Sequence, residues 1–321
     1  MKILILRFSS IGDIVLTSPV VRCLKQQLNN SEIHFLTKKS FASTVENNPN
    51  VDKVFSFEKN VDEVLQELQK ENYDWVIDLH HNLRSMQVKR ALGKPSKSFN
   101  KLNIEKWLLV NLKINCLPKK HIVDRYFETV SHLGVKNDLK GLDFFIDAKN
   151  EVAISSLAKE YQNGFIAFVI GAKHNTKKLP DEKIISICKK LNRPVILIGG
   201  KEDFETGEKI EANVKKQEPR IINACGNYNL QQSASLIKQS EKVITHDTGM
   251  MHIAAAFQKN IISVWGSTVP EFGMYPYMPG KESKIVEVKN ISCRPCSKIG
   301  FEKCPKGHFK CMNEIDENLC L

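Results

Sequence analysis

The chain has 321 residues, 42% of them hydrophobic, and a formal net charge of +11 at pH 7. Its length exceeds a single domain of roughly 100–200 residues, so we expect two folded domains. No apolar run approaches the ~20 residues that a membrane-spanning helix needs. The apolar stretch that begins at Met1 is interrupted by charge at Arg7 and is too short for a signal peptide. We therefore expect a cytoplasmic protein.

In the first half of the chain, short apolar runs alternate with amphipathic stretches. The predicted strands are Lys2–Phe8, Glu32–Thr37, Lys53–Phe57 and Trp75–Leu79. The predicted helices are Asp13–Leu28, Val61–Lys70 and Ile122–Leu133. Continuously apolar strands separated by helices are typical of a parallel sheet that is covered on both faces.

The turn after the first strand reads Ser9-Ser10-Ile11-Gly12-Asp13. A dinucleotide-binding turn would need G-x-G-x-x-G, and Gly12 is the single glycine here, which disfavours an oxidoreductase. Asp13 has two interpretations. It is a residue type that caps a helix and offsets the helix dipole. Alternatively, at the carboxyl end of a strand, its carboxylate could take a proton from a sugar hydroxyl as a general base.

Most of the positive charge lies in one segment. Between Arg84 and Arg125 there are eleven lysines and arginines against two acids, a net +9. A lysine-rich solvated face is one interpretation, and a surface for anionic lipid or phosphorylated glycan is the other. The segment lacks an aromatic-rich ribonucleoprotein signature and zinc-finger spacing, so we expect no nucleic-acid partner.

A second alternating series fills the other half of the chain, beyond a polar boundary near Ala148–Asn163. The predicted strands are Phe165–Gly171, Val195–Gly199, Ile221–Ala224, Lys242–Thr245 and Ile261–Trp265. The predicted helices are Asp181–Leu191, Phe204–Lys215, Leu230–Gln239 and Met250–Phe257. Two successive doubly wound domains are the expected architecture, divided as residues 1–155 and 156–321.

One predicted strand is followed directly by the string Asp247-Thr248-Gly249-Met250-Met251-His252. Three alanines come after one further residue. Backbone N–H groups and the positive end of the dipole at such a helix start favour a diphosphate. Gly249 permits close backbone approach, the Thr248 hydroxyl can donate to phosphate, and His252 lies on the first helical turn. A capped, tightly packed helix is the structural alternative, and it is compatible with this site.

Three lysines occupy the loop after the first strand of this second series: Lys173, Lys177 and Lys178. They are either surface charge or, opposite a diphosphate, the cations that neutralise a leaving group.

The tail is rich in cysteine. Cys293, Cys296, Cys304 and Cys311 follow at spacings that fit no familiar zinc motif, so structural zinc and free thiols remain equal alternatives. Disulfides are disfavoured in a cytosolic protein. Cys23, Cys116, Cys188 and Cys225 are expected in the core.

Together these features resemble glycosyltransferase family 9, the bacterial lipopolysaccharide heptosyltransferases. The residues that carry the resemblance are Ser9 to Asp13, Asp78 to Ser85, Lys177 to Pro180, Asp247 to Ala256 and the cysteine tail. The resemblance implies the GT-B fold, with two Rossmann-like domains facing across a cleft. It implies acceptor binding by the N-terminal domain and nucleotide-sugar binding by the C-terminal one. It also implies an inverting, metal-independent transfer of heptose, usually from ADP-heptose, to a phosphorylated lipopolysaccharide core or lipid A acceptor at the inner membrane.

On matching positions the resemblance assigns roles to residues. Asp13 is the general base; Lys177, Asp247, Thr248, Gly249 and His252 hold the donor. The expected acceptor contacts are Ser9, Ser10, Gly12, His80, Asn82 and Arg84. The chain departs from the family at Leu179, where tryptophan is usual, and near Gln231 and Gln232, where an acid would contact the ribose.

Two other functions are compatible with the same architecture. A nucleotide-sugar epimerase would not need the basic segment. A non-catalytic protein that binds anionic glycan or lipid would keep that segment but could dispense with Asp13.

Overall fold

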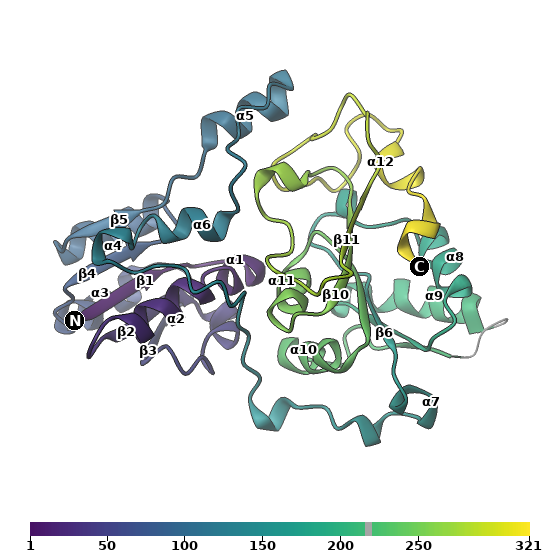
Figure 1. Cartoon of the computed structure of the whole chain (residues 1–321), viewed down its shortest axis with the longest axis horizontal. Helices are drawn as coiled ribbons and strands as arrows, with labels where there is room; N and C mark the ends of the chain where they lie inside the picture. Colours follow the sequence, from purple (N-terminus) through teal and green to yellow (C-terminus); the bar gives the residue numbers. More distant parts are fainter. Residues whose placement is uncertain (216–219) are drawn as a thin grey trace. The chain divides into compact units, whose positions relative to one another are not determined.

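The computed structural model describes residues 1–215 and 220–321. The chain forms two compact units (Figure 1). The first comprises Met1–Leu102 and Lys120–Phe145, and the second comprises Asn103–Lys119 and Ile146–Leu321. The basic segment is therefore not one surface of one unit, because residues 103–119 belong to the second unit. The expected division of acceptor and donor binding between the domains stays a prediction.

The first unit is built on a five-stranded parallel sheet in the order β3-β2-β1-β4-β5. Its strands are β1 (Lys2–Leu6), β2 (Glu32–Lys38), β3 (Lys53–Phe57), β4 (Trp75–Asp78) and β5 (Ser96–Ser98). The residues of β1 from Ile3 to Leu6 are completely buried, as expected for a central parallel strand. The four predicted strands of this half are confirmed, and β5, which is short and polar, was missed.

Helices connect these strands. They are α1 (Ile11–Val15), α2 (Ser18–Gln27), α3 (Asp62–Lys70), α4 (Leu83–Leu92) and α6 (Ile122–Phe127), with 3₁₀ turns at Lys39–Thr44 and Ser131–Leu133. The single helix expected over Asp13–Leu28 is wrong: the chain forms two helices with a break at Leu16 and Thr17. Pro19 explains the break, because its nitrogen has no hydrogen to continue the helical ladder and proline is accepted in a first turn.

The second unit carries a six-stranded parallel sheet in the order β11-β10-β9-β6-β7-β8. Its strands are β6 (Ile166–Val169), β7 (Val195–Ile198), β8 (Ile221–Asn223), β9 (Lys242–His246), β10 (Asn260–Trp265) and β11 (Lys284–Glu287). Its helices are α5 (Asn103–Leu112), α7 (Lys159–Gln162), α8 (Asp181–Lys190), α9 (Phe204–Lys215), α10 (Leu230–Gln239), α11 (Gly249–Ala256) and α12 (Lys310–Asn313). Its 3₁₀ turns are Ala148–Asn150, Ile154–Ser156, Asn175–Lys177, Lys201–Asp203, Pro270–Phe272 and Glu317–Cys320.

Each sheet reverses its strand order at one place, between β1 and β4 in the first unit and between β6 and β9 in the second. The crevice outside the carboxyl ends of the strands at such a switch point is where open α/β sheets bind ligands. The residues that follow β1, β4, β6 and β9 therefore lie where a ligand would bind. They include every residue that the sequence predicted for acceptor and donor binding.

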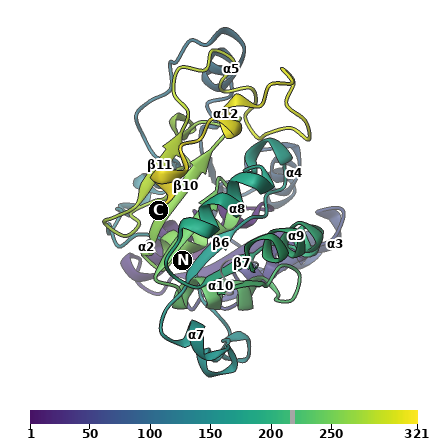
Figure 2. The same ribbon diagram turned by 90° about the vertical axis from the view of Figure 1, so that its right-hand side faces the viewer.

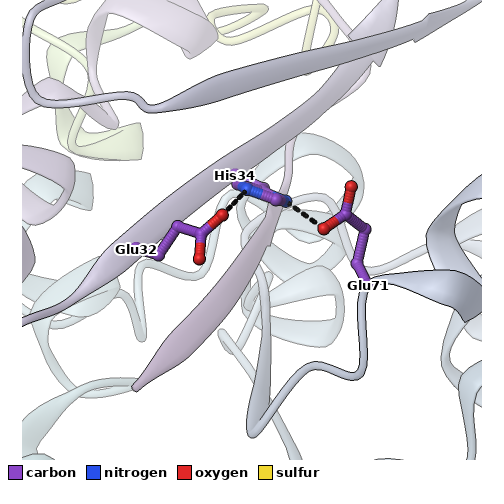
Figure 3. Close-up of side chains that lie close together, drawn as sticks. All are labelled: Glu32, His34 and Glu71. Atoms are coloured by element: carbon purple, nitrogen blue, oxygen red, sulfur yellow. Dashed lines mark hydrogen bonds and ion pairs between the residues drawn. The ribbon is translucent and has the colours of Figure 1, made fainter.

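The amino ends of the first sheet carry a separate polar cluster (Figure 3). His34 on β2 lies between Glu32 and Glu71, with its Nε2 2.8 Å from Glu32 and its Nδ1 4.0 Å from Glu71. Both carboxylates also bind lysine: Lys2 contacts Glu32 and Glu71, and Lys53 contacts Glu71 at 2.6 Å. Because ammonium groups already neutralise these acids, the cluster is an ion-pair network that ties the strand starts together.

Among the residues that the structure describes, no helix combines the length and the apolar character needed to cross a membrane.

Candidate active site

Asp13 lies in the first turn of α1, directly beyond the carboxyl end of β1, and its carboxylate is held from two sides. Oδ1 is 2.6 Å from the Arg7 guanidinium. Oδ2 accepts hydrogen bonds from the Ser10 hydroxyl at 2.8 Å and the Ser10 N–H at 3.2 Å. The second bond is that of a helix-capping acid, so the capping interpretation is confirmed. The side chain nevertheless stays 19% exposed, which leaves it accessible to a ligand.

Arg7 fixes the position of this carboxylate. It is 7% exposed, and its Nε donates to Ser9 O at 2.9 Å. Its Nη1 donates to Leu79 O and, at 3.1 Å, to the Tyr126 hydroxyl. Burial, the largest single influence, opposes the charge, but Asp13, Tyr126 and Asp78 together outweigh it, and the pKa of Arg7 is raised. The guanidinium therefore links the turns after β1 and β4 to Asp13. The sequence did not assign a role to Arg7 or Tyr126; the signal for Arg7 was a charged residue at the end of an apolar strand.

His80 begins the turn after β4, and its ring packs on Phe8 with 4.7 Å between centroids. Its Nδ1 is buried and has no hydrogen-bond partner among the described residues. Burial, followed by the positive charges of Arg7 and Lys101, lowers the pKa of His80 to about 3. The imidazole is therefore neutral at physiological pH and adds no positive charge to this turn.

Asp78, the last residue of β4, organises that turn from beneath. It is completely buried, and its Oδ1 accepts from the His80 and His81 N–H groups at 3.0 and 2.6 Å. Its Oδ2 accepts from Ser85 and lies 2.9 Å from Lys89. Burial favours a higher pKa for Asp78, but these hydrogen bonds and the Lys89 charge outweigh burial, so the pKa of Asp78 is lowered. The carboxylate is thus ionised and orients the residues from 80 to 85. The sequence indicated Asp78 as part of the family motif but not this orienting role.

The structure brings the six expected acceptor residues to adjacent turns. Ser9, Ser10 and Gly12 follow β1, while His80, Asn82 and Arg84 follow β4, and Leu79 N donates to Leu6 O at 3.1 Å between the two strands. Asn82 uses its side-chain oxygen to cap α4, accepting from Ser85 N at 2.9 Å. Arg84 is exposed on the first turn of α4. Their binding roles stay predictions.

In the second unit, Lys177 and Asp247 form an ion pair at 2.6 Å. Lys177 ends the 3₁₀ turn in the loop after β6, and Asp247 follows β9, the neighbouring strand. Asp247 Oδ2 also accepts from the Thr268 hydroxyl at 2.8 Å. Two residues predicted to contact the donor therefore lie together at the switch point of this sheet.

The helix that begins beside them is α11. Thr248 is its N-cap residue with extended backbone, and Gly249 is its first helical residue. The Thr248 side chain does not bond to the helix backbone. The first N–H groups of α11 are thus left for another acceptor, as a phosphate site requires. His252 lies on the same turn and is 3% exposed, and its donor contact stays a prediction.

The neighbouring lysine has a different partner. Lys178 lies 2.6 Å from Asp203, a buried carboxylate that also accepts from Gly200 N at 2.9 Å. Gly171 and Gly199 leave the space that Asp203 fills, since a Cβ on either glycine would collide with it. Lys178 is therefore engaged in holding the loops after β6 and β7 together. Leu179, where the family usually has tryptophan, is buried, and its N–H donates to His246 Nε2 at 2.9 Å.

The two glutamines near the expected ribose contact are also engaged. The Gln231 side chain accepts from Asp147 N at 2.9 Å and from the Asn150 amide at 3.1 Å. Gln232 accepts from Asn229 N at 3.0 Å and thereby caps α10. Neither supplies a carboxylate for a ribose.

All nine cysteines are free thiols. Cys293 Sγ lies 3.7 Å from His308 Nε2, and Cys296 Sγ donates to Cys293 O. Tetrahedral zinc–thiolate bonds of ~2.3 Å place sulfur atoms within about 4 Å of each other. Over residues 1–215 and 220–321, the one group of three candidate metal ligands within 4.8 Å is the Glu32 cluster, so the tail thiols are not gathered in this way. Burial raises the pKa of Cys296 to about 12 and that of Cys311 to about 11, which keeps both protonated.

Three of the four scattered cysteines lie in the core as expected, but Cys116 is exposed, and that expectation was wrong. It follows α5 in a stretch of mostly exposed residues.

Comparison with known proteins gives a consistent class. The family model of glycosyltransferase family 9 (heptosyltransferase) matches residues 61–304. Lipopolysaccharide heptosyltransferase 1 of Campylobacter coli is 27% identical over 293 residues, covering 84% of each chain. The solved family 9 glycosyltransferase of Veillonella parvula has a TM-score of 0.78 at 21% identity, over 99% of this chain and 94% of that one. E. coli ADP-heptose lipopolysaccharide heptosyltransferase II has a TM-score of 0.72 at 21% identity, over 98% of both.

The two doubly wound units thus have the fold of GT-B glycosyltransferases, which confirms the expected fold class. Because the family model covers most of the chain, the protein belongs to glycosyltransferase family 9 (heptosyltransferase) and is a glycosyltransferase. This membership does not favour the epimerase or the non-catalytic binding protein.

Proposed function

We propose that this enzyme transfers a heptose from an ADP-heptose-like donor to an anionic lipopolysaccharide core or lipid A acceptor, with inversion at the anomeric carbon. The names of the relatives support the sugar and the acceptor class. The observation that carries the proposal is the Asp13 carboxylate, fixed by Arg7 and partly exposed at the switch point of the first sheet.

Asp13 is the proposed general base. An acceptor hydroxyl attacks the anomeric carbon as the bond from that carbon to the diphosphate oxygen breaks, and Asp13 takes the hydroxyl proton. Arg7 and Ser10 hold and orient the carboxylate, and its partial exposure leaves it within reach of the acceptor hydroxyl.

The leaving diphosphate is the proposed ligand of the second switch point. The N–H groups at the start of α11, with Thr248 and Gly249, would hold its oxygens, and Lys177 would neutralise the charge that develops on departure. In the structure Lys177 is paired with Asp247 at 2.6 Å. A bound diphosphate would therefore compete with Asp247 for this ammonium group, and Asp247 would be free to accept from a donor hydroxyl. His252, which is buried on this turn, is the remaining proposed donor contact.

On the acceptor side, Ser9, Ser10 and Gly12 would meet the sugar that receives the heptose. The neutral His80 ring and Asn82 supply hydrogen bonds, and Arg84 supplies charge for an acceptor phosphate. No metal takes part in the proposed transfer. Structural zinc in the cysteine tail is the alternative to free thiols, and the separation of the tail thiols favours free thiols. We place the enzyme in the cytoplasm, in peripheral contact with the inner membrane that carries the acceptor.

The function is tested by incubating the purified full-length protein with ADP-heptose and a heptose-free lipopolysaccharide core. Mass spectrometry should show the acceptor gain one heptose while ADP is released in equal amount. Conversion of the donor to an isomer without ADP release would identify the epimerase instead. A thermal-shift series over nucleoside diphosphates independently tests which nucleobase the donor carries, since the true nucleotide raises the melting temperature by mass action.

A further inference from the structure

Helix α5 has large apolar side chains on two opposite faces. Leu109 faces inward and packs with Val269 and Phe272 in a small core of the second unit. On the other face Ile104, Trp107 and Leu112 are each at least half exposed. Ile104 and Trp107, three residues apart, form an outward stripe of the helix, and Leu112 is exposed on its last turn. The inward face explains why α5 folds with the second unit, but no described residue covers the outward stripe.

A loop of the cysteine tail extends this apolar surface. Ile299 and Phe301 are exposed. The segment that carries them contacts the chain at the start of α5 and just after its end. Lys298 Nζ contacts Asn103 O at 3.4 Å, and Lys113 Nζ donates to Pro295 O at 2.7 Å. Figure 2 shows this yellow loop beside α5. Two segments almost 200 residues apart in the sequence thus present apolar side chains together.

These apolar groups come from lysine-rich segments. The two segments, residues 103–119 and 298–310, contain seven lysines against Glu105 and Glu302. Lys119, Lys303, Lys306 and Lys310 are exposed. An apolar stripe with an indole and a rim of lysines is complementary to the interface of an anionic bilayer, where tryptophan lies at headgroup level and ammonium groups meet phosphate. The same like-charged rim would repel a second copy of the chain.

We propose that the outer face of α5 and the 298–306 loop form a docking surface for an anionic lipid bilayer. This inference deepens the proposed function, because it assigns the expected membrane contact to a defined surface of the second unit. The ten residues of α5 rise about 15 Å, half of the ~30 Å hydrocarbon core, so the helix lies along the interface. Ile104, Trp107 and Ile299 enter the headgroup layer, and the lysines remain at the phosphates.

The test is co-sedimentation of the full-length protein with phosphatidylcholine vesicles, with or without about one-third phosphatidylglycerol, in the absence of acceptor and donor. We expect binding to the anionic vesicles alone and release at about 0.5 M salt, where charge interactions are screened. Ile104→Glu combined with Trp107→Glu should weaken binding at least about tenfold, since both apolar insertion and charge are lost. The control is Ile285→Glu, a comparably exposed apolar residue on β11, which should bind like the wild type.

Fluorescence supplies a second measurement. Of the three tryptophans, Trp265 is buried and Trp75 is packed on His132, so a blue shift on vesicle addition should vanish with Trp107→Phe. Wild-type binding by the double glutamate variant would overturn the proposal. A second result would also overturn it: the wild type is a dimer, the double glutamate variant is a monomer, and neither protein binds vesicles. The double glutamate variant should keep its ADP-induced thermal shift. Failure of the wild type to transfer heptose would contradict the proposed function but would not affect the vesicle result.

Discussion

Arg7 and Asp13 form a 2.6 Å ion pair at the carboxyl end of the central strand of the first sheet. The same guanidinium bonds to Ser9 O, Leu79 O and the Tyr126 hydroxyl, so the position of the carboxylate is set by three segments of the chain. A base whose position is fixed in this way needs little reorganisation when the acceptor hydroxyl arrives.

Asp13→Asn should abolish transfer and leave the fold intact. Asparagine can keep the contact with Ser10 but cannot take a proton, and loss of a general base typically costs 10²–10⁴-fold in rate, so we expect a fall of about 10³-fold in kcat. ADP binding, followed by thermal shift, should stay unchanged. Asp62→Asn, an acid on α3 in the same unit, is the matched control and should retain full activity. Turnover within about threefold of wild type would exclude Asp13 as the base.

Arg7→Lys should lower kcat by about 10- to 100-fold without changing the KM for the donor. A lysine ammonium cannot reach Asp13 and the two carbonyl oxygens at once, so the carboxylate loses its orientation. Arg22→Lys is the control, because Arg22 is equally buried and pairs with Asp138 and Asp143 at a distance from the active site. Both variants should melt at lower temperature. Equal losses of activity in the two would mean that Arg7 acts through stability alone.

Lys177→Ala should weaken ADP binding by about 10- to 100-fold, because a charge-assisted bond to phosphate contributes roughly 1.5–3 kcal/mol. Lys178→Ala is the adjacent control: its ammonium pairs with the buried Asp203, so its loss should lower the melting temperature and leave ADP affinity nearly unchanged. Isothermal titration calorimetry separates the two effects. The reverse pattern would move the diphosphate contact to Lys178.

Acid should destabilise the first unit through Glu71. Hydrogen bonds from Lys2 and Lys53 lower the pKa of Glu71 to about 2, from an unperturbed 4.5. A carboxylate with a lowered folded-state pKa binds fewer protons when folded, so its stabilisation is complete above the unfolded pKa and is lost as pH falls from about 4.5 to about 2. Melting curves of Glu71→Gln should therefore depend less on pH across that window than those of the wild type. Glu58→Gln, an exposed acid that pairs with Lys39, should keep the wild-type dependence.

The tail cysteines should behave as thiols. Denatured protein without reductant should titrate nine thiols with a disulfide reagent, since every cysteine is free. Freshly purified protein should contain less than about 0.1 equivalent of zinc, because a structural zinc site would be nearly fully occupied. One equivalent of zinc, lost in a Cys293→Ser variant, would instead establish a metal site and require the tail to rearrange.

Much of the architecture could be predicted from local pattern. All nine predicted strands are present, because buried parallel strands are continuous apolar runs that stand out from amphipathic helices. The missed strands, β5 and β11, lie at sheet edges, where one side has no neighbouring strand and the residues are largely exposed. Helices α4, α5, α7 and α12 were also missed. Of these, α5 is apolar on two faces, so its sequence has little of the one-sided periodicity that marks a surface helix.

The sequence by itself determined the two α/β series and the family, since these depend on short-range pattern. It also indicated the residues that follow each central strand, because the carboxyl ends of parallel strands lie at the same edge of a sheet. The tertiary structure decided which of two adjacent lysines meets Asp247 and which meets Asp203, because only folding brings loops from different strands together. It also decided that residues 103–119 join the second unit, through Leu109 packing on residues some 160 positions later. For Asp13 the sequence supplied the residue and its near neighbour Arg7. The fold supplied Leu79 O and the Tyr126 hydroxyl, which come from distant parts of the chain and hold Arg7 in place.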